Sequence, residues 1–317
     1  VFYYKKFRNL ENLIKNIFMN TEIIIDISGY SFSSQMGQGW LTYILDIIIA
    51  KRYSISYYIF PQSIGPFEFS LKHRIFFYPL AKAYLKYPKK IFVRENDGLR
   101  YIRQFTKFNV KKSYDIVLQH NKYDLNHIFN RKINLKEFKI QSNSVGIIPN
   151  RRVFERIDSV KIYEIYRLII NKLLENGKTI YILRHSFEDL NICKNIKNFF
   201  INNKWVKLIE DDLNVFEIEN IISKFDFIVA SRYHSIIHSY RYGIPVIAIG
   251  WAAKYNELLE LFDQSIYIFD IKNQLENYDF IKKLDLMLSN YNHEKNIITT
   301  KLNEILAKKV SLNNMLN

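Results

Sequence analysis

The chain has 317 residues, 48% of them hydrophobic, which is enough for two domains that each bury a core. Lys and Arg outnumber Asp and Glu by 46 to 31, so the formal net charge is +15. The basic residues are spread along the sequence, without an arginine-rich arm or zinc-finger spacing. This distribution disfavours nucleic acid and leaves small anionic ligands or an anionic membrane face. The single cysteine, Cys193, excludes an intrachain disulfide framework.

No apolar run approaches the ~18 residues that a membrane span needs, and the first residues lack a signal-peptide layout. We therefore expect a cytoplasmic protein, with peripheral contact to the inner membrane face left open. The chain does not begin with Met, so we expect the natural chain to start before residue 1.

Short apolar runs alternate with stretches of helical period, a pattern typical of parallel βα units. The predicted strands are 22–27, 56–60, 90–93, 144–148, 179–183, 225–230 and 246–249. Between them the periodicity predicts helices, for example 161–175, which Gly177 ends.

The polar stretch 130–143 precedes a fresh strand and is the best domain boundary in the sequence. We predict an N-terminal α/β lobe over residues 1–140, a C-terminal α/β lobe over 141–290 and a helical tail over 291–317. Each lobe is expected to hold a parallel, Rossmann-like sheet.

The segment 226–254 is the most informative part of the chain. Its apolar run ends at Ser231, which we predict to be the N-cap of a helix over 235–242, with Gly243 as the left-handed cap. Arg232 and His234 then lie at a helix N-terminus, where a small anion binds well. His234 is the candidate general acid or base.

Three other predicted strands also end in arginine. Arg94 follows 90–93, Arg151 and Arg152 follow 144–148, and Arg184 with His185 follows 179–183. Because ligands of parallel sheets bind at the carboxyl ends of the strands, these arginines favour an anionic substrate.

Two loops of the N-terminal half add polar groups. In the loop 26–37, the backbone N–H groups around Gly29 could bind an anion. The loop 60–67 joins Gln62 and Ser63 to a rigid turn at Gly65.

His234 and His238 have the i, i+4 spacing of a helical zinc site, but no glutamate stands beside His234 and no third ligand follows. We predict no metal and interpret His238 as a packing residue.

These residues resemble the polysaccharide pyruvyl transferase family. The matching pieces, in order, are Asp26-Ile-Ser-Gly29, Pro61-Gln62-Ser63-Ile64-Gly65-Pro66-Phe67, Arg94-Glu95, Val145-Gly-Ile-Ile-Pro149, His185 with Asp189, Ser231-Arg232-Tyr233-His234, Gly243-Ile-Pro245 and Trp251-Ala-Ala-Lys254-Tyr255. The resemblance implies a GT-B-like pair of Rossmann-type lobes with the active site in the cleft between them. It also implies a first strand of the N-terminal lobe upstream of Asp26, which residues 1–20 lack, so we expect that strand to be missing.

It also implies transfer of pyruvate from phosphoenolpyruvate to two hydroxyls of a sugar or lipid-linked glycan, forming a ketal, with no cofactor beyond this donor. The catalytic residues would be His234, Arg232 and Arg94, with His234 transferring protons and the arginines holding the donor. The expected substrate-binding residues are Gly29, Gln62, Ser63, Gly65, Arg151, Arg184, His185, Tyr233 and Lys254.

Two other functions remain open at this point. A glycosyltransferase using nucleotide sugars could employ the same two-lobe frame, since fold alone does not fix function. A basic scaffold binding membrane or nucleic acid would need no residues clustered at strand ends, and is the less favoured of the two.

Overall fold

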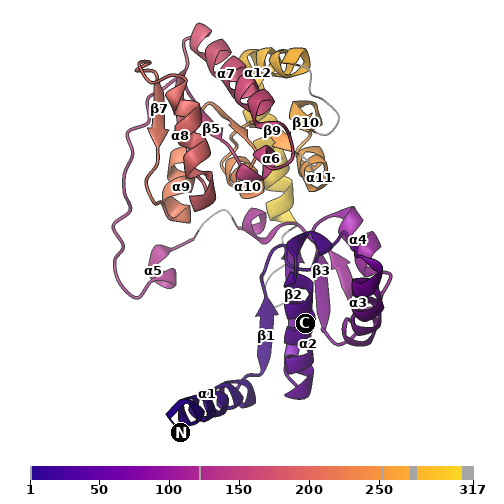
Figure 1. Cartoon of the computed structure of the whole chain (residues 1–317). Coiled ribbons are helices and arrows are strands. Elements are labelled where there is room, and N and C mark those ends of the chain that lie inside the picture. Colours follow the sequence, from indigo (N-terminus) through magenta and orange to yellow (C-terminus); the bar gives the residue numbers. More distant parts are fainter. Residues whose placement is uncertain (1, 121–122, 251–252, 272–276, 309–317) are drawn as a thin grey trace. The chain divides into compact units, whose positions relative to one another are not determined.

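The computed structural model describes residues 2–120, 123–250, 253–271 and 277–308 (Figure 1). The contacts divide them into two compact units, unit 1 up to Ile116 and unit 2 from Val117 to Lys308. The division therefore falls before the polar stretch 130–143. That stretch belongs with unit 2 because the Tyr123 hydroxyl donates to Glu219 at 2.9 Å and the Lys136 backbone donates to Glu217 at 2.8 Å. Residues 291–307 continue a long helix and form no separate tail.

Unit 1 contains a parallel four-stranded sheet in the order β1-β2-β3-β4. Its elements are α1 (Phe2–Met19), β1 (Ile23–Asp26), α2 (Gly39–Arg52), β2 (Ser56–Gln62), α3 (Leu71–Tyr84), β3 (Lys90–Val93), α4 (Asn96–Ile102) and β4 (Val110–Lys112). Each connection moves one strand in the same direction, so right-handed crossovers place α2, α3 and α4 on one face. Side chains of these three helices share one aromatic-rich core with β2 and β3.

Unit 2 contains a parallel six-stranded sheet in the order β10-β9-β8-β5-β6-β7. Its elements are α5 (Leu125–Ile128), β5 (Ser144–Ile148), α6 (Arg151–Phe154), α7 (Ser159–Glu175), β6 (Thr179–Leu183), α8 (Leu190–Asn198), β7 (Val206–Ile209), α9 (Val215–Ile222), β8 (Phe227–Ala230), α10 (Tyr233–Arg241), β9 (Val246–Gly250), α11 (Ala253–Leu261), β10 (Ile268–Asp270) and α12 (Asn277–Ala307). The chain runs outward from β5 to β7 and returns to β8 on the other side of β5.

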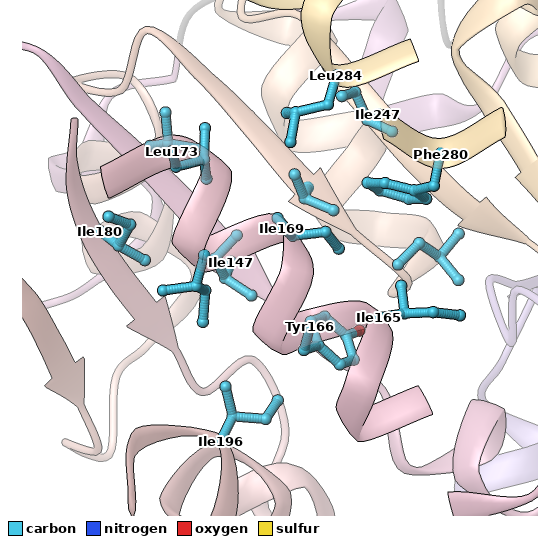
Figure 2. Packing of buried hydrophobic residues seen from close by; sticks show 14 of the residues in the cluster. Ile147, Ile165, Tyr166, Ile169, Leu173, Ile180, Ile196, Ile247, Phe280 and Leu284 are labelled. Carbon is cyan, nitrogen blue, oxygen red and sulfur yellow. The ribbon is translucent and has the colours of Figure 1, made fainter. Parts of the chain in front are cut away.

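The core of unit 2 forms where α7 and α12 cover this sheet. Ile165, Ile169 and Leu173 of α7 pack with Ile147 of β5 and Ile180 of β6 (Figure 2). The period-3.6 face predicted for this helix is therefore confirmed, and Gly177 follows it with a φ of 68°.

The strands at 90–93, 144–148 and 179–183 are confirmed at the predicted bounds. The sequence did not reveal β4, β7 and β10, which have only three or four residues each and lie at or next to the ends of their sheets. The prediction that Ser231 caps α10 was wrong. Arg232 is the N-cap residue, and the Ser231 side chain is fully buried between β8 and β5.

Among the described residues, no helix combines the length and the apolar character that crossing a bilayer requires. The same residues hold no group of three or more His, Cys, Asp or Glu arranged to bind a metal ion.

Candidate functional site

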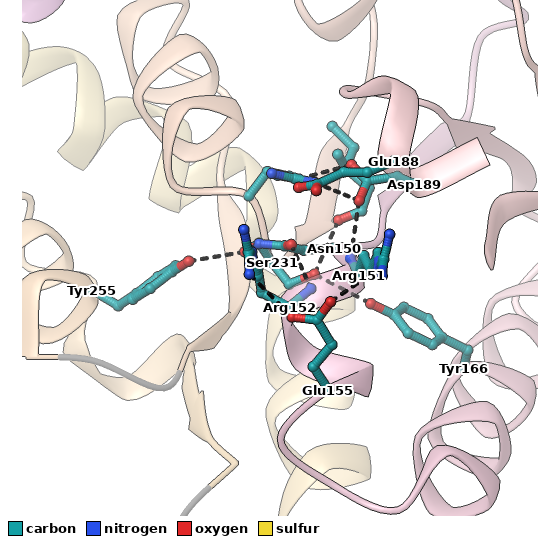
Figure 3. Close-up of polar contacts among 11 residues, drawn as sticks. Asn150, Arg151, Arg152, Glu155, Tyr166, Glu188, Asp189, Ser231 and Tyr255 are labelled. Atoms are coloured by element: carbon teal, nitrogen blue, oxygen red, sulfur yellow. Dashed lines mark hydrogen bonds and ion pairs between the residues drawn. The ribbon is translucent and has the colours of Figure 1, made fainter. Parts of the chain in front are cut away.

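The strand order of unit 2 reverses between β5 and β8. Connections leave these neighbouring strands in opposite directions, as they do at the ligand-binding switch point of doubly wound sheets. The two loops are tied together, because the Asn150 side-chain amide donates to the Ser231 carbonyl at 3.0 Å. The Tyr255 hydroxyl donates to the same carbonyl at 3.0 Å (Figure 3).

Arg232 follows β8 at this switch point and is oriented by two carboxylates. Its Nε donates to Asp189 Oδ2 at 2.7 Å, and its Nη2 donates to Asp189 Oδ1 at 2.6 Å and Glu188 Oε1 at 2.5 Å. Its Nη1 donates to no described residue, and 18% of the side chain is exposed. The guanidinium is therefore held on one side and keeps donors for a ligand.

Asp189 joins the ends of three strands. Its carboxylate is fully buried and also accepts the Arg151 backbone N–H at 2.9 Å (Figure 3). The loops after β5, β6 and β8 thus share one acceptor. For Glu188, the hydrogen bond from Arg232 lowers the carboxyl pKa, although burial opposes this shift.

Three more predicted residues gather around the start of α10. His234 is exposed, and its ring stands perpendicular to that of Tyr233, with 5.7 Å between centroids. The Lys254 ammonium lies 5.0 Å from the centroid of Tyr233. The corner thus combines a guanidinium, an imidazole and an ammonium, all suited to an anionic substrate. Trp251 and Ala252 of the predicted motif lie outside the described residues.

His185 follows β6 and is held neutral. Burial, together with the positive charges of His238, Arg232 and His234, lowers the pKa of its imidazole to about 3. Its Nε2 is buried and has no hydrogen-bond partner among the described residues, although the residue as a whole keeps some exposure. His185 can therefore offer a neutral hydrogen bond but not a positive charge.

Arg184, Arg151 and Arg152 have other contacts. Arg184 is buried, donates to the Asp211 carbonyl at 2.6 Å and lies over the Phe187 ring at 4.6 Å. Arg151 and Arg152 are exposed and pair with Glu155 at 3.0 and 3.2 Å. Only the backbone N–H of Arg151 reaches the carboxylate that holds Arg232.

The sequence did not reveal Glu219 of α9, which is the centre of a buried polar cluster. Its carboxylate, 1% exposed, accepts from His238 Nδ1 and Arg241 Nη1, each at 2.7 Å. The hydroxyls of Tyr123 and Tyr242 donate to it at 2.9 and 3.2 Å. His238 is buried as predicted, but it anchors α10 through this carboxylate rather than by apolar packing alone. No local sequence motif could have indicated the contact between Glu219 and His238, because α9 and α10 come together only in the folded protein.

In unit 1, Arg94 ties together the loops that follow the strands. Its Nη2 donates to Ser63 Oγ at 2.6 Å and to the Gly29 carbonyl at 3.1 Å, and its Nη1 pairs with Asp115. The Ser63 hydroxyl donates onward to Glu95 at 2.6 Å. The structure thus brings Gly29, Ser63 and Arg94 together, but both Nη groups of the buried arginine have internal acceptors.

Gln62 and Gly65 lie beside this cluster. The Gln62 side chain is fully buried and accepts from Ser28 at 3.2 Å, whereas its Nε2 has no partner among the described residues. Gly65 has a φ of 78°, and a Cβ there would lie 2.3 Å from the Tyr101 ring. Only glycine fits this turn.

The chain folds into two parallel-sheet α/β units, and the solved structures that are similar to it have the GT-B-like fold. S. aureus MnaA, solved with UDP, matches with a TM-score of 0.59 and 11% identity over 94% of this chain and 76% of its own. Methanocaldococcus jannaschii UDP-GlcNAc 2-epimerase matches with 0.54 and 13% over 82% and 73%. A Rickettsia africae glycosyltransferase matches with 0.51 and 15% over 95% and 89%. At these identities the similarity shows the fold alone.

The family is shown by the sequence itself. The model of the polysaccharide pyruvyl transferase family matches residues 1–253, so the chain belongs to this family and is a transferase. A comparison with curated proteins found no match. Arg232 and His234 lie near the C-terminal end of the matched region, and Lys254 is the first residue beyond it.

Proposed function

We propose that the protein transfers pyruvate from phosphoenolpyruvate to two hydroxyls of a sugar in a cell-surface polysaccharide or its precursor, forming a ketal. Membership of the pyruvyl transferase family supports pyruvylation. The observation that supports phosphoenolpyruvate as the donor is the position of Arg232. Two carboxylates orient this residue beside His234 and Lys254, while its Nη1 remains available to a ligand. Phosphoenolpyruvate carries a carboxylate and a phosphate, and the fork of an arginine fits either group.

The reaction needs a proton on the enol carbon and a leaving phosphate. We assign the protonation of C3 to His234, which leaves a cation-like C2 that the first sugar hydroxyl attacks. Phosphate then departs with the C2–O bond pair, and the second hydroxyl closes the ketal. The two hydroxyl protons balance the proton on C3 and the proton on phosphate. Arg232 and Lys254 stabilise the charge of the departing phosphate.

We assign Arg94 a positioning role within unit 1, where it orders the loops that carry Gly29 and Ser63. Arg94 holds the loop that carries Ser63, and Gln62 offers a buried amide N–H group.

The test is phosphate release from phosphoenolpyruvate in the presence of candidate glycan acceptors. Arg232→Lys should retain charge but lose the fork, lowering kcat/KM by roughly 10²-fold, and His234→Ala should lower kcat by a similar or larger factor. Arg167→Lys, at an exposed position of α7, serves as the control and should keep activity within about threefold. Wild-type turnover in Arg232→Lys and His234→Ala would refute the assignment.

A nucleotide-sugar transferase is the second candidate, because similar structures were solved with UDP or UDP-GlcNAc. Thermal-shift titration separates the two functions. Phosphoenolpyruvate should raise the Tm of wild type and not of Arg232→Ala. A response to UDP-sugars with none to phosphoenolpyruvate would favour the second candidate.

A further inference from the structure

The first two turns of α3 expose large apolar side chains. Leu71, Ile75 and Phe76 have 75%, 62% and 68% of their surface exposed, whereas the next residue, Phe77, is fully buried in the unit 1 core. Phe108, which follows α4, is exposed over its whole surface. Such a group on one unit is unusual, since exposed apolar residues are normally scattered.

Basic residues surround these apolar side chains. Residues 69–94 contain no Asp or Glu, and exposed Lys72 and Arg74 alternate with the apolar positions of α3. The outer face of α4 adds Arg100, Arg103 and Lys107, which line a shallow open depression. Asp97 is the one acidic residue of α4, and it pairs with Arg100 at 3.1 Å.

The two helices are neighbours on one face of the unit 1 sheet. The Arg74 guanidinium lies 5.5 Å from the Tyr78 ring centroid, and the Tyr78 ring lies 5.4 Å from that of Phe105, just after α4. Figure 1 shows α3 and α4 on the same side of β3. The apolar and basic residues therefore form one α3–α4 surface, made of Leu71, Lys72, Arg74, Ile75, Phe76, Arg100, Arg103, Lys107 and Phe108.

We propose that the α3–α4 surface docks the protein onto an anionic lipid bilayer. Apolar side chains enter the boundary between headgroups and acyl chains, while the basic residues contact anionic headgroups. Charge complementarity selects this occupant. A second copy packed through the same surface would place like charges together, and nucleic acid offers no apolar phase for Leu71 and Ile75. The docking is independent of the proposed reaction and is tested by binding alone.

The first experiment measures vesicle co-sedimentation of the whole chain. Phosphatidylcholine vesicles with about a third phosphatidylglycerol should bind wild type at least tenfold more tightly than phosphatidylcholine alone. Leu71→Ser/Ile75→Ser/Phe76→Ser should weaken this binding by about tenfold or more. The matched control Val160→Ser/Ile201→Ser/Ile266→Ser removes three exposed side chains of unit 2 and should bind as wild type does.

The charges are tested in parallel. Arg103→Glu/Lys107→Glu should weaken binding by about fivefold or more for each reversed charge. The control Lys161→Glu/Lys204→Glu makes the same change of net charge on unit 2 and should have a much smaller effect. Equal losses in the two variants would mean that net charge, and not this surface, drives binding, and would overturn the proposal.

Insertion has its own readout. Phe76→Trp should show blue-shifted emission with the anionic vesicles and quenching by brominated lipid, and Ile201→Trp should show neither. Wild-type binding by the triple serine variant, no binding by wild type, or an unshifted Phe76→Trp would each refute the docking. Light scattering that shows a dimer lost in the triple serine variant would assign the surface to a second copy instead.

Discussion

Asp189 has no exposed surface, yet it accepts hydrogen bonds from the Arg151 backbone and from two nitrogen atoms of Arg232. A buried carboxylate is tolerated only when it is paired and hydrogen-bonded in this way. The orientation of the proposed catalytic arginine therefore depends on a residue that does not itself contact the substrate.

Removing this carboxylate should cost both stability and donor binding. We expect Asp189→Ala to lower the free energy of unfolding by roughly 2–4 kcal/mol, because Arg232 and the Arg151 N–H lose a buried acceptor. Urea denaturation measures the loss. Glu188→Ala removes the more exposed partner of the same arginine and should cost no more than about 1 kcal/mol. Equal losses for the two variants would contradict this account.

His185 should make stability depend on pH. Its pKa is about 3 in the folded protein and about 6.5 when unfolded, so between these values the unfolded chain binds the extra proton. The contribution of the neutral imidazole to the free energy of unfolding is therefore complete above pH ~6.5. As the pH falls below this value, the free energy of unfolding decreases by at most about 1.4 kcal/mol per pH unit. Glu188 acts in the same direction only below its ordinary pKa, about 4.3.

The measurement is a series of urea unfolding curves between about pH 5 and 7. His185→Gln should flatten the dependence in this range. His127→Gln, whose side chain is 85% exposed, is the control and should leave the slope as in wild type. An unchanged slope in His185→Gln would show that the imidazole has the same pKa in the folded and unfolded protein, which would contradict this account.

At the scale of elements, α10 is the helix that presents Arg232 and His234, and its other end is fixed by Glu219. This carboxylate of α9 binds His238 and Arg241, which lie on later turns of α10. The anchor and the proposed catalytic corner thus belong to the same helix. We infer that α9 supports the site without contributing a residue to it.

The turn after β2 depends on one glycine. Gly65→Ala should cost roughly 3 kcal/mol, since it adds a left-handed penalty to a clash with the Tyr101 ring. Gly177→Ala has a similar φ of 68° with nothing within 4 Å of its Cβ and should cost only about 1 kcal/mol. Unfolding curves of the two variants isolate the clash, and equal losses would argue against close packing at Gly65.

Element prediction succeeded where a segment is buried on both faces. The strands β5 and β6 are wholly buried, so their apolar runs are continuous and end sharply. Element prediction failed for β7, whose two middle residues are partly exposed. It also failed for the N-cap of α10, because the Ser231 side chain donates to the Ile148 carbonyl of β5 and does not cap the helix.

For the whole molecule, a net charge of +15 is spread over the sequence, but the fold concentrates part of it. Around α3 and α4 it coincides with exposed apolar side chains, and at the start of α10 it coincides with a sheet switch point. We therefore propose that the same composition supplies two chemically different surfaces, one for lipid headgroups and one for a small anionic donor.

The sequence by itself determined the parallel α/β class, most strands, the residues that follow them and the family of the chain. It did so because apolar runs, helix periodicity and motif order are local properties of a chain. Only the tertiary structure decided that the strand order reverses between β5 and β8, that Asp189 and Glu188 orient Arg232, and that Arg94 has internal acceptors. These contacts join residues that are tens of positions apart in the sequence. Their partners are selected by strand pairing and side-chain burial, which no short motif encodes.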